Sequence, residues 1–310
     1  MKGAAFKARD AASYDDVSED FDRFSERFSA PLADRLLALG EVGPGQRVLD
    51  VGTGTGIVAL RAATASGPAG RVVGIDLSEG MLETARRKAR VAGIGDRLEF
   101  RRADAEAIDL PDSSQDVVLS LFALLHFPDP AAALREIRRV LRPGGRLALG
   151  VGSPPPLFSR AGLQRGLRRI GELLRERRGL EAAAPRALEA LVRARLPATA
   201  SDEVTPLEGG GHRKPRLVHA LVREAGFVRI RTCWEGHEAG LDTPEEFWEL
   251  QRTYSTPARK RLAAAPPDLA RSVREELLAR AARVRERGGR LVYRHAALFV
   301  AAERPAGGDV

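Results

Sequence analysis

Residues Arg47–Gly56 read RVLDVGTGTG, a short apolar run that ends in glycines at every second position. The apolar run has the length of a buried strand, because strands of a parallel sheet are covered on both faces and are hydrophobic throughout. Gly52 and Gly54 permit a tight turn and a close approach of a ligand to the backbone, and Gly56 permits close packing of the helix on the strand. A helical pattern follows at Ile57–Ala65. The stretch therefore predicts a strand, a glycine turn and a helix, the first unit of a doubly wound α/β fold.

An acidic residue closes the next predicted strand. Arg71–Asp76 reads RVVGID, and Asp76 lies 20 residues after Gly56. A carboxylate in this place can accept hydrogen bonds from the ribose hydroxyls of a nucleotide-like ligand bound at the glycine turn. The alternative is a tight turn without a ligand and a surface aspartate. The glycine loop, the strand before it and the acid agree with one another, which favours the interpretation with a bound ligand.

The spacing of the glycines distinguishes between two adenosine ligands. Dinucleotide-binding loops have the spacing G-x-G-x-x-G, whereas this loop has G-x-G-x-G with Asp50 just before it. A carboxylate at Asp50 would repel a pyrophosphate, but it would attract the ammonium and sulfonium groups of S-adenosylmethionine. The sequence therefore favours S-adenosylmethionine over a nicotinamide dinucleotide, and an oxidoreductase is the weaker interpretation.

The rest of the chain predicts one sheet with insertions. A polar helix is expected at Ser18–Leu39, and strands and helices then alternate up to residue 151, with the helix Pro130–Leu141 ended by a Pro-Gly-Gly stop. An arginine-rich helical stretch to about Leu196 and a loop at Pro197–Pro215 interrupt the alternation, and two last strands follow near 227–233 and 291–303. We expect an α/β fold, a Rossmann-like, seven-stranded, mostly parallel sheet with helices on both faces and inserted helical cap segments.

This organisation divides the chain into four parts. They are a helical lid at 1–40, a cofactor-binding core at 41–152, a helical cap at 153–215, and the remainder of the core at 216–310 with a second helical insertion at about 235–290.

On these residues the chain resembles the class I S-adenosylmethionine-dependent methyltransferases, most closely the group of ubiquinone and menaquinone C-methyltransferases. The resemblance covers Tyr14–Val151 and Leu217–Arg231. It rests on segments that read VLDVGTGTG, VVGIDLSEGMLETAR, FRRADAEAIDLPDSSQDVVLS, ALLHFPDP and ALREIRRVLRPGGRLAL. One departure is Thr53, where many relatives have cysteine.

The resemblance implies the residues that bind the cofactor. At the methionine and ribose end they are Asp50, Gly52, Thr53, Gly54, Gly56 and Asp76, the last on the ribose hydroxyls. At the adenine they are Leu77, Met81, Asp104 and, through its backbone N–H, Ala105. The backbone near Ser120 and Leu121 would meet the methionine ammonium. Structural alternatives stay open, since Met81 could belong to the core, Asp104 to a turn, and Asp50 could cap a neighbouring backbone.

His126 is the candidate catalytic base. It follows the fourth predicted strand at its carboxyl end, where open α/β sheets bind ligands, and imidazole titrates in the range that a base needs. Relatives share this histidine whatever their acceptor, so a structural role in fixing the loop is the alternative. No histidine–carboxylate cluster has metal-ligand spacing, and we expect no metal.

Composition limits the possible partners. The 310 residues carry a net charge of +8 and include a single cysteine, Cys233, so an internal disulfide framework is excluded. Lysine and arginine total 50, which invites a nucleic-acid substrate. However, the Asn/Asp-Pro-Pro-aromatic motif of base-amino methyltransferases is missing after the fourth strand, where the sequence reads Leu121-Phe122-Ala123-Leu124. No apolar run is long enough for a membrane span, and no secretory signal is visible.

The sequence as a whole predicts a cytoplasmic enzyme, active as a monomer or homodimer. It would transfer a methyl group from S-adenosylmethionine to a small aromatic or hydrophobic metabolite, at oxygen, carbon or nitrogen, in a biosynthetic role. The alternatives are a nucleic-acid methyltransferase and a non-catalytic protein that binds S-adenosylmethionine. No nucleic-acid partner is expected.

Overall fold

The protein consists of two compact units. The computed structural model describes residues 2–153, 160–184, 186–198, 207 and 214–307. One unit comprises residues 1–154, 204–235 and 297–310, and the other comprises 155–203 and 236–296. The strands β7 (Val228–Leu241) and β8 (Arg290–Glu303) each have one part in each unit.

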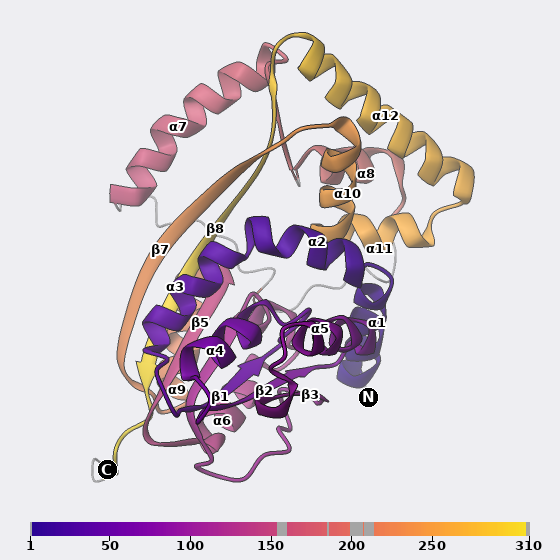
Figure 1. Ribbon diagram of the computed structural model, residues 1–310. Helices are drawn as coiled ribbons and strands as arrows, with labels where there is room; N and C mark the ends of the chain where they lie inside the picture. Colours follow the sequence, from indigo (N-terminus) through magenta and orange to yellow (C-terminus); the bar gives the residue numbers. More distant parts are fainter. Residues whose placement is uncertain (1, 154–159, 185, 199–206, 208–213, 308–310) are drawn as a thin grey trace. The chain divides into compact units, whose positions relative to one another are not determined.

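The first unit is built on a mostly parallel sheet (Figure 1). Its other strands are β1 (Arg47–Val51), β2 (Arg71–Asp76), β3 (Leu98–Arg102), β4 (Gln115–Leu121) and β5 (Leu141–Gly152). Their order is β3-β2-β1-β4-β5-β8, with β7 paired to β8. The neighbouring strands from β3 to β5 are parallel, whereas β5 and β8 run antiparallel through the pairs Arg146–Glu303 to Gly152–Ala297. The predicted Rossmann-like sheet is confirmed.

Helices cover both faces of this sheet because successive strand residues point to opposite sides. Val48 and Val117 are buried in one cluster together with side chains of α3, α4 and α5. Their neighbours Leu49 and Val118 are buried in another cluster with side chains of α6 and α9. The helices are α3 (Ala30–Gly40), α4 (Ile57–Ser66), α5 (Glu79–Val91), α6 (Pro130–Val140) and α9 (Lys214–Glu224), and the short 3-10 helices are η1 (Gly95–Arg97) and η2 (Leu124–His126).

The strand order decides where a ligand can bind. The chain passes from β1 to β2 and β3 on one side, and then returns to place β4 on the other side of β1. The loops that follow β1 and β4 therefore leave the sheet in opposite directions, and the crevice between them is the usual ligand site of doubly wound folds.

The N-terminal part differs from the prediction of one helix at Ser18–Leu39. It contains α1 (Lys2–Asp15), which lies in the expected helical lid but before the start of the expected helix, then α2 (Ser18–Phe28) and α3. The break between α2 and α3 has a clear cause. Pro31 lies in the first turn of α3, where its missing N–H does no harm, whereas inside a continuous helix it would remove a hydrogen bond.

The second unit is mainly helical. Its elements are α7 (Arg160–Arg177), β6 (Glu181–Ala184), α8 (Arg186–Arg195), α10 (Pro244–Tyr254), α11 (Thr256–Ala264) and α12 (Pro267–Glu286). Side chains of α8, α10 and α12 form its core, with Leu191, Phe247 and Leu277 buried. The expected unbroken helical stretch to Leu196 is wrong at β6, which pairs in parallel with Arg290–Tyr293 of β8.

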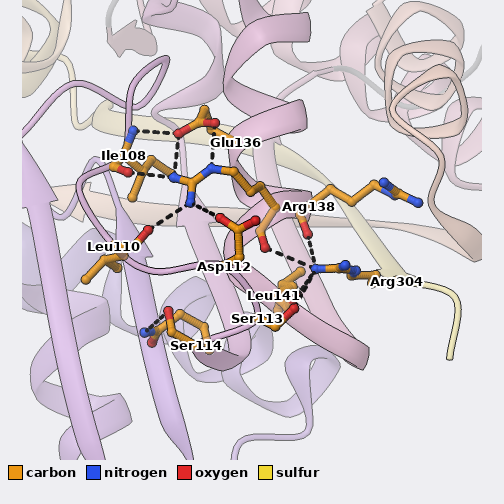
Figure 2. Close-up of polar contacts among 11 residues, drawn as sticks. Ile108, Leu110, Asp112, Ser113, Ser114, Glu136, Arg138, Leu141 and Arg304 are labelled. Carbon is orange, nitrogen blue, oxygen red and sulfur yellow. Dashed lines mark hydrogen bonds and ion pairs between the residues drawn. The ribbon is translucent and has the colours of Figure 1, made fainter. Parts of the chain in front are cut away.

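Two arginines, Arg139 and Arg304, stabilise the loop between β3 and β4 and the end of α6 in the first unit (Figure 2). Arg139 donates to the Glu136 and Asp112 carboxylates and to the carbonyls of Ile108 and Leu110, over 2.6–2.8 Å. Arg304 donates to the carbonyls of Arg138, Arg139 and Leu141. These contacts hold the β3–β4 loop and the backbone at the C-terminal end of α6 in place, and none of them involves the loop after β1.

Two further observations concern sequence expectations. The loop expected at Pro197–Pro215 lies largely outside the described residues. None of the helices in the described part of the chain combines the length and apolar character that crossing a membrane requires.

Candidate functional site

The three glycines of the loop after β1 have different surroundings. All have positive φ, +70° at Gly52, +53° at Gly54 and +81° at Gly56. A Cβ on Gly52 would lie 2.1 Å from that of Ala123, and one on Gly56 would lie 3.0 Å from the Phe100 ring. A Cβ on Gly54 would meet nothing within 4 Å. Gly52 and Gly56 thus allow close packing, whereas Gly54 borders open space that a side chain would fill.

Asp76 at the end of β2 is bound to this loop. Its Oδ2 accepts from the Gly54 N–H at 2.9 Å, and its Oδ1 accepts from the Ser78 N–H at 3.0 Å. Desolvation raises the pKa of the carboxyl group, although both N–H groups oppose the rise. The structure therefore brings the glycine loop and the acid together, as the sequence pattern predicts. Leu77 follows at the start of the turn into α5.

Asp50 is a buried carboxyl group at the end of β1. Thr53 Oγ1 donates to its Oδ2 at 2.7 Å. Its Oδ1 is buried and accepts no hydrogen bond of normal geometry among the described residues, although the Ala59 backbone N–H is close enough to lower the pKa of the group. Burial raises the pKa of Asp50 to about 7, and the nearby Asp76 carboxylate contributes to the rise. A buried acceptor without a partner is unfavourable unless something supplies a donor, which an ammonium group would do.

The residues expected at the adenine lie beyond β2 and β3. Met81, in the first turn of α5, and Ala105 are almost fully buried. Asp104 Oδ1 accepts from the Glu106 N–H at 3.0 Å, which is a local turn, and its Oδ2 accepts from Lys7 Nζ at 2.7 Å. A ligand amino group at Asp104 would therefore share the carboxylate with Lys7.

The end of β4 forms the other wall of the crevice. Ser120 Oγ donates to the carbonyl of Val51 at 2.9 Å, which ties β4 to the end of β1. Leu121 pairs with Gly150 of β5. Phe122 follows with φ +62°, and its N–H donates to the Gly150 carbonyl at 2.6 Å. A positive φ at an aromatic residue is strained, and such strain is typical of functional sites.

His126 is the last residue of η2 and lies four residues after Phe122. Its Nδ1 is 3.2 Å from Oδ2 of Asp10. Its Nε2 is 3.4 Å from the Tyr14 hydroxyl, and the two rings meet edge to face. The ring is close enough to Asp76 to lower that carboxyl's pKa electrostatically.

Helix α1 supplies contacts that the sequence analysis missed. Besides Asp10 and Lys7, Asp15 accepts through Oδ1 from Ser78 Oγ at 2.5 Å and from the Gly80 N–H at 3.0 Å. These residues belong to no motif and are polar residues of a short helix. The signal that the sequence offers is Tyr14, an aromatic residue near the end of this segment.

The arrangement can hold a ligand with a hydroxylated ring and a cationic end. Asp76 can accept from hydroxyl groups, the open side of Gly54 leaves room beside the backbone, and Asp50 can pair with a cation. Among the described residues, no group of three or more histidine, cysteine, aspartate or glutamate side chains could hold a metal ion.

Comparisons with known proteins agree with this arrangement. A family model described as a methyltransferase domain matches residues 49–149, which contain the glycine loop, Asp76, Asp104 and His126. A putative methyltransferase from Bacillus halodurans has a similar fold, with a TM-score of 0.50, 22% identity, and 88% of this chain and 98% of that chain covered.

Two curated relatives are similar in sequence. The 27-O-demethylrifamycin SV methyltransferase of Amycolatopsis mediterranei is 41% identical over 52% of this chain, and the match spans only 56% of the relative's length. The nocamycin O-methyltransferase of Saccharothrix syringae is 32% identical over 95% of this chain and 99% of its own length. Because the second likeness extends over both chains, this protein belongs to the family of class I S-adenosylmethionine-dependent methyltransferases.

Proposed function

We propose that this chain transfers the methyl group of S-adenosylmethionine to an oxygen atom of a small aromatic or hydrophobic metabolite. The observation that carries the proposal is the pair of carboxyl groups Asp50 and Asp76, which end adjacent strands and border one glycine loop. Asp50 would face the cationic end of the ligand, and Asp76 would face its hydroxyl groups. The names of both curated relatives refer to an oxygen-linked methyl group, which supports oxygen as the methylated atom.

The residues around the loop fit the cofactor. Asp76 would bind the ribose hydroxyls, and Asp50, Gly52, Thr53, Gly54 and Gly56 would surround the methionine and ribose end, with Gly52 and Gly56 acting through packing. Leu77 and Met81 would contact the adenine. The Asp104 carboxylate would accept a hydrogen bond from the adenine amino group, and the Ala105 backbone N–H would donate one to the adenine. The backbone at Ser120 and Leu121 would meet the ammonium group.

The chemistry asks little of the protein beyond alignment. The sulfonium is already an activated leaving group, so the site mainly orients the acceptor in line and excludes water. A hydroxyl acceptor must also lose a proton, and His126 is the base that we propose for this step.

Calorimetric titration of the cofactor-stripped protein with S-adenosylhomocysteine tests the proposal, with NADH as a parallel control. We expect micromolar binding of the first and no binding of the second. A screen of hydroxylated acceptors with methyl-labelled S-adenosylmethionine would follow. Binding of NADH alone would overturn the proposal, and labelled product with RNA or DNA, but with no small molecule, would replace it with a nucleic-acid substrate.

A further inference from the structure

We propose that Asp10 on α1 positions His126 by holding the proton on Nδ1, so that Nε2 is the atom that takes the proton from a hydroxyl group of the acceptor. This inference rests on the proposed methyl transfer to oxygen and adds a residue from outside the motifs identified in the sequence. Asp10 would act through His126 without touching the acceptor, so it is a positioning residue.

The geometry around the ring distinguishes its two nitrogens. The carboxylate oxygen Oδ2 of Asp10 lies 3.2 Å from Nδ1, which is an ion-pair distance although the ring N–H is not aligned on it as a hydrogen bond, and the side chain of Asp10 is only 10% exposed. A carboxylate beside one ring nitrogen favours the tautomer in which that nitrogen carries the proton. Nε2 is then an acceptor, and the Tyr14 hydroxyl, 3.4 Å away, can donate to it.

The His126 ring also lies close to the glycine loop of the proposed cofactor site. The backbone N–H of His126 donates to the backbone carbonyl of Ala123 at 2.8 Å, which closes the η2 turn. Ala123 in turn packs against Gly52, with no room between them for a Cβ. His126 is thus connected through one turn of backbone to the glycine loop of the cofactor site.

The elements α1 and β2 bring charged or titratable groups to His126. Asp10 and Tyr14 face it from α1, and Asp76 interacts with it electrostatically from the end of β2. Both carboxylates stabilise the imidazolium that forms when the ring accepts a proton. The Tyr14 hydroxyl can leave Nε2 when an acceptor hydroxyl takes its place.

The resulting step balances in atoms and electrons. The acceptor O–H bond breaks and its proton moves to Nε2, while an oxygen electron pair forms the bond to the methyl carbon. The carbon–sulfur bond breaks and its electron pair stays on sulfur, which becomes a neutral thioether. The imidazolium, paired with Asp10, later returns the proton to water. A positioned base of this kind accelerates such a transfer by about 10²–10⁴-fold.

Nitrogen-15 NMR of the histidine rings tests the role of Asp10 without any acceptor. The spectra are recorded at a pH where His126 is neutral, and its signals are identified by their absence in His126→Gln. We expect the Nδ1–H tautomer in the wild-type protein and in Asp10→Asn, whose amide oxygen can still accept from Nδ1. Asp10→Ala should shift His126 to the Nε2–H tautomer, and Tyr14→Phe, the matched control on the same helix, should not.

Two results would overturn the inference. One is an Nε2–H tautomer in the wild-type protein, which needs no variant and decides the matter even if Asp10→Ala does not fold. The other is an unchanged tautomer in folded Asp10→Ala. Titration of the same samples with S-adenosylhomocysteine separates this inference from the proposed function: Asp10→Ala should keep the wild-type affinity within about twofold, whereas loss of binding in the wild-type protein would count against the function itself.

Discussion

The backbone N–H of Gly54 donates to Oδ2 of Asp76 across 2.9 Å, so one carboxylate fixes the glycine loop and also faces the space beside it. The other oxygen of Asp76 accepts from Ser78, the N-cap residue of α5. Asp76 therefore has a structural role in addition to its proposed role on the ribose. We therefore expect removal of its carboxylate to weaken the local fold as well as cofactor binding.

Replacing Asp76 should separate these two roles. Asp76→Asn keeps one oxygen for a backbone N–H but loses the charge, and we expect affinity for S-adenosylhomocysteine to fall about 10- to 150-fold, from about 1.5–3 kcal/mol per charged hydrogen bond. Asp76→Ala should bind at least as weakly and should also melt at a lower temperature, because both N–H groups lose their acceptor. Calorimetric titration and thermal unfolding measure the two effects. Wild-type affinity in both variants would show that the site lies elsewhere.

Gly54 offers a test of the open space beside the loop. Gly54→Ala places a methyl group where the structure has no atom within 4 Å, and we expect binding of S-adenosylhomocysteine to be lost. The matched control is Gly45→Ala, since Gly45 has a similar positive φ of +79° and the same open surroundings, but lies before β1. Both variants should lose about 1 kcal/mol of stability from backbone strain. Equal binding by the two variants would contradict the assigned site.

Because burial raises the pKa of Asp50, we expect cofactor binding to release protons. Its pKa of about 7 leaves the group about half protonated at pH 7, whereas an ammonium ligand requires the ionised form. Binding at pH 7 should release about half a proton, and affinity should rise with pH between 6 and 8. Titrations in buffers with different ionisation enthalpies measure the released protons. In Asp50→Asn the release should disappear, and a wild-type protein without release would argue that the ammonium binds elsewhere.

The sequence predicts the loop and its acid well because their signals are local. Arg47–Val51 is a short, mostly apolar run with the glycines directly after it, and Arg71–Asp76 is a second mostly apolar run that ends in the acid. The strands have the predicted bounds because burial on both faces requires such runs. The Gly54–Asp76 hydrogen bond then follows from two parallel neighbouring strands.

Other features depend on partners that are distant in the sequence. The strand β6 has the sequence EAAA, which has no β-branched residue, and it exists because Arg290–Tyr293 offers a paired edge. Lys7, Asp10 and Asp15 are likewise ordinary polar residues of α1. They acquire a role only through contacts with Asp104, His126 and Ser78, and no local pattern encodes those contacts.

Arg139 should matter for stability alone. Arg139→Gln removes the donor of the two carboxylates and two carbonyls in Figure 2, and we expect a loss of about 2 kcal/mol in the free energy of unfolding. The control is Arg101→Gln, which breaks an exposed pair with Glu99 and should change stability by less than about 1 kcal/mol. Urea unfolding measures both. Affinity for S-adenosylhomocysteine should stay at the wild-type value, and its loss in Arg139→Gln would mean that the network also positions the site.

His295 in the second unit makes stability depend on pH. It lies on β8, with its ring centroid 5.5 Å from that of His237 and 5.0 Å from that of Tyr293. Burial lowers the pKa of His295 to about 4, and His237 adds to the effect. The ring is therefore neutral in the folded protein at pH 5–7, whereas in the unfolded chain it binds a proton below its ordinary value of about 6.5.

The sign of the effect follows from proton linkage. Between pH 4 and 6.5 the unfolded state binds more protons at this position, so stability falls as the pH is lowered through this range. The full contribution of His295 is at most about 3 kcal/mol. His295→Phe should flatten the dependence when urea unfolding is measured from pH 4.5 to 7.5, and His219→Gln on α9 should leave it unchanged. If His295→Phe keeps the wild-type slope, other groups carry the acid sensitivity, and the imidazole of His295 is protonated in the folded protein as readily as in the unfolded chain.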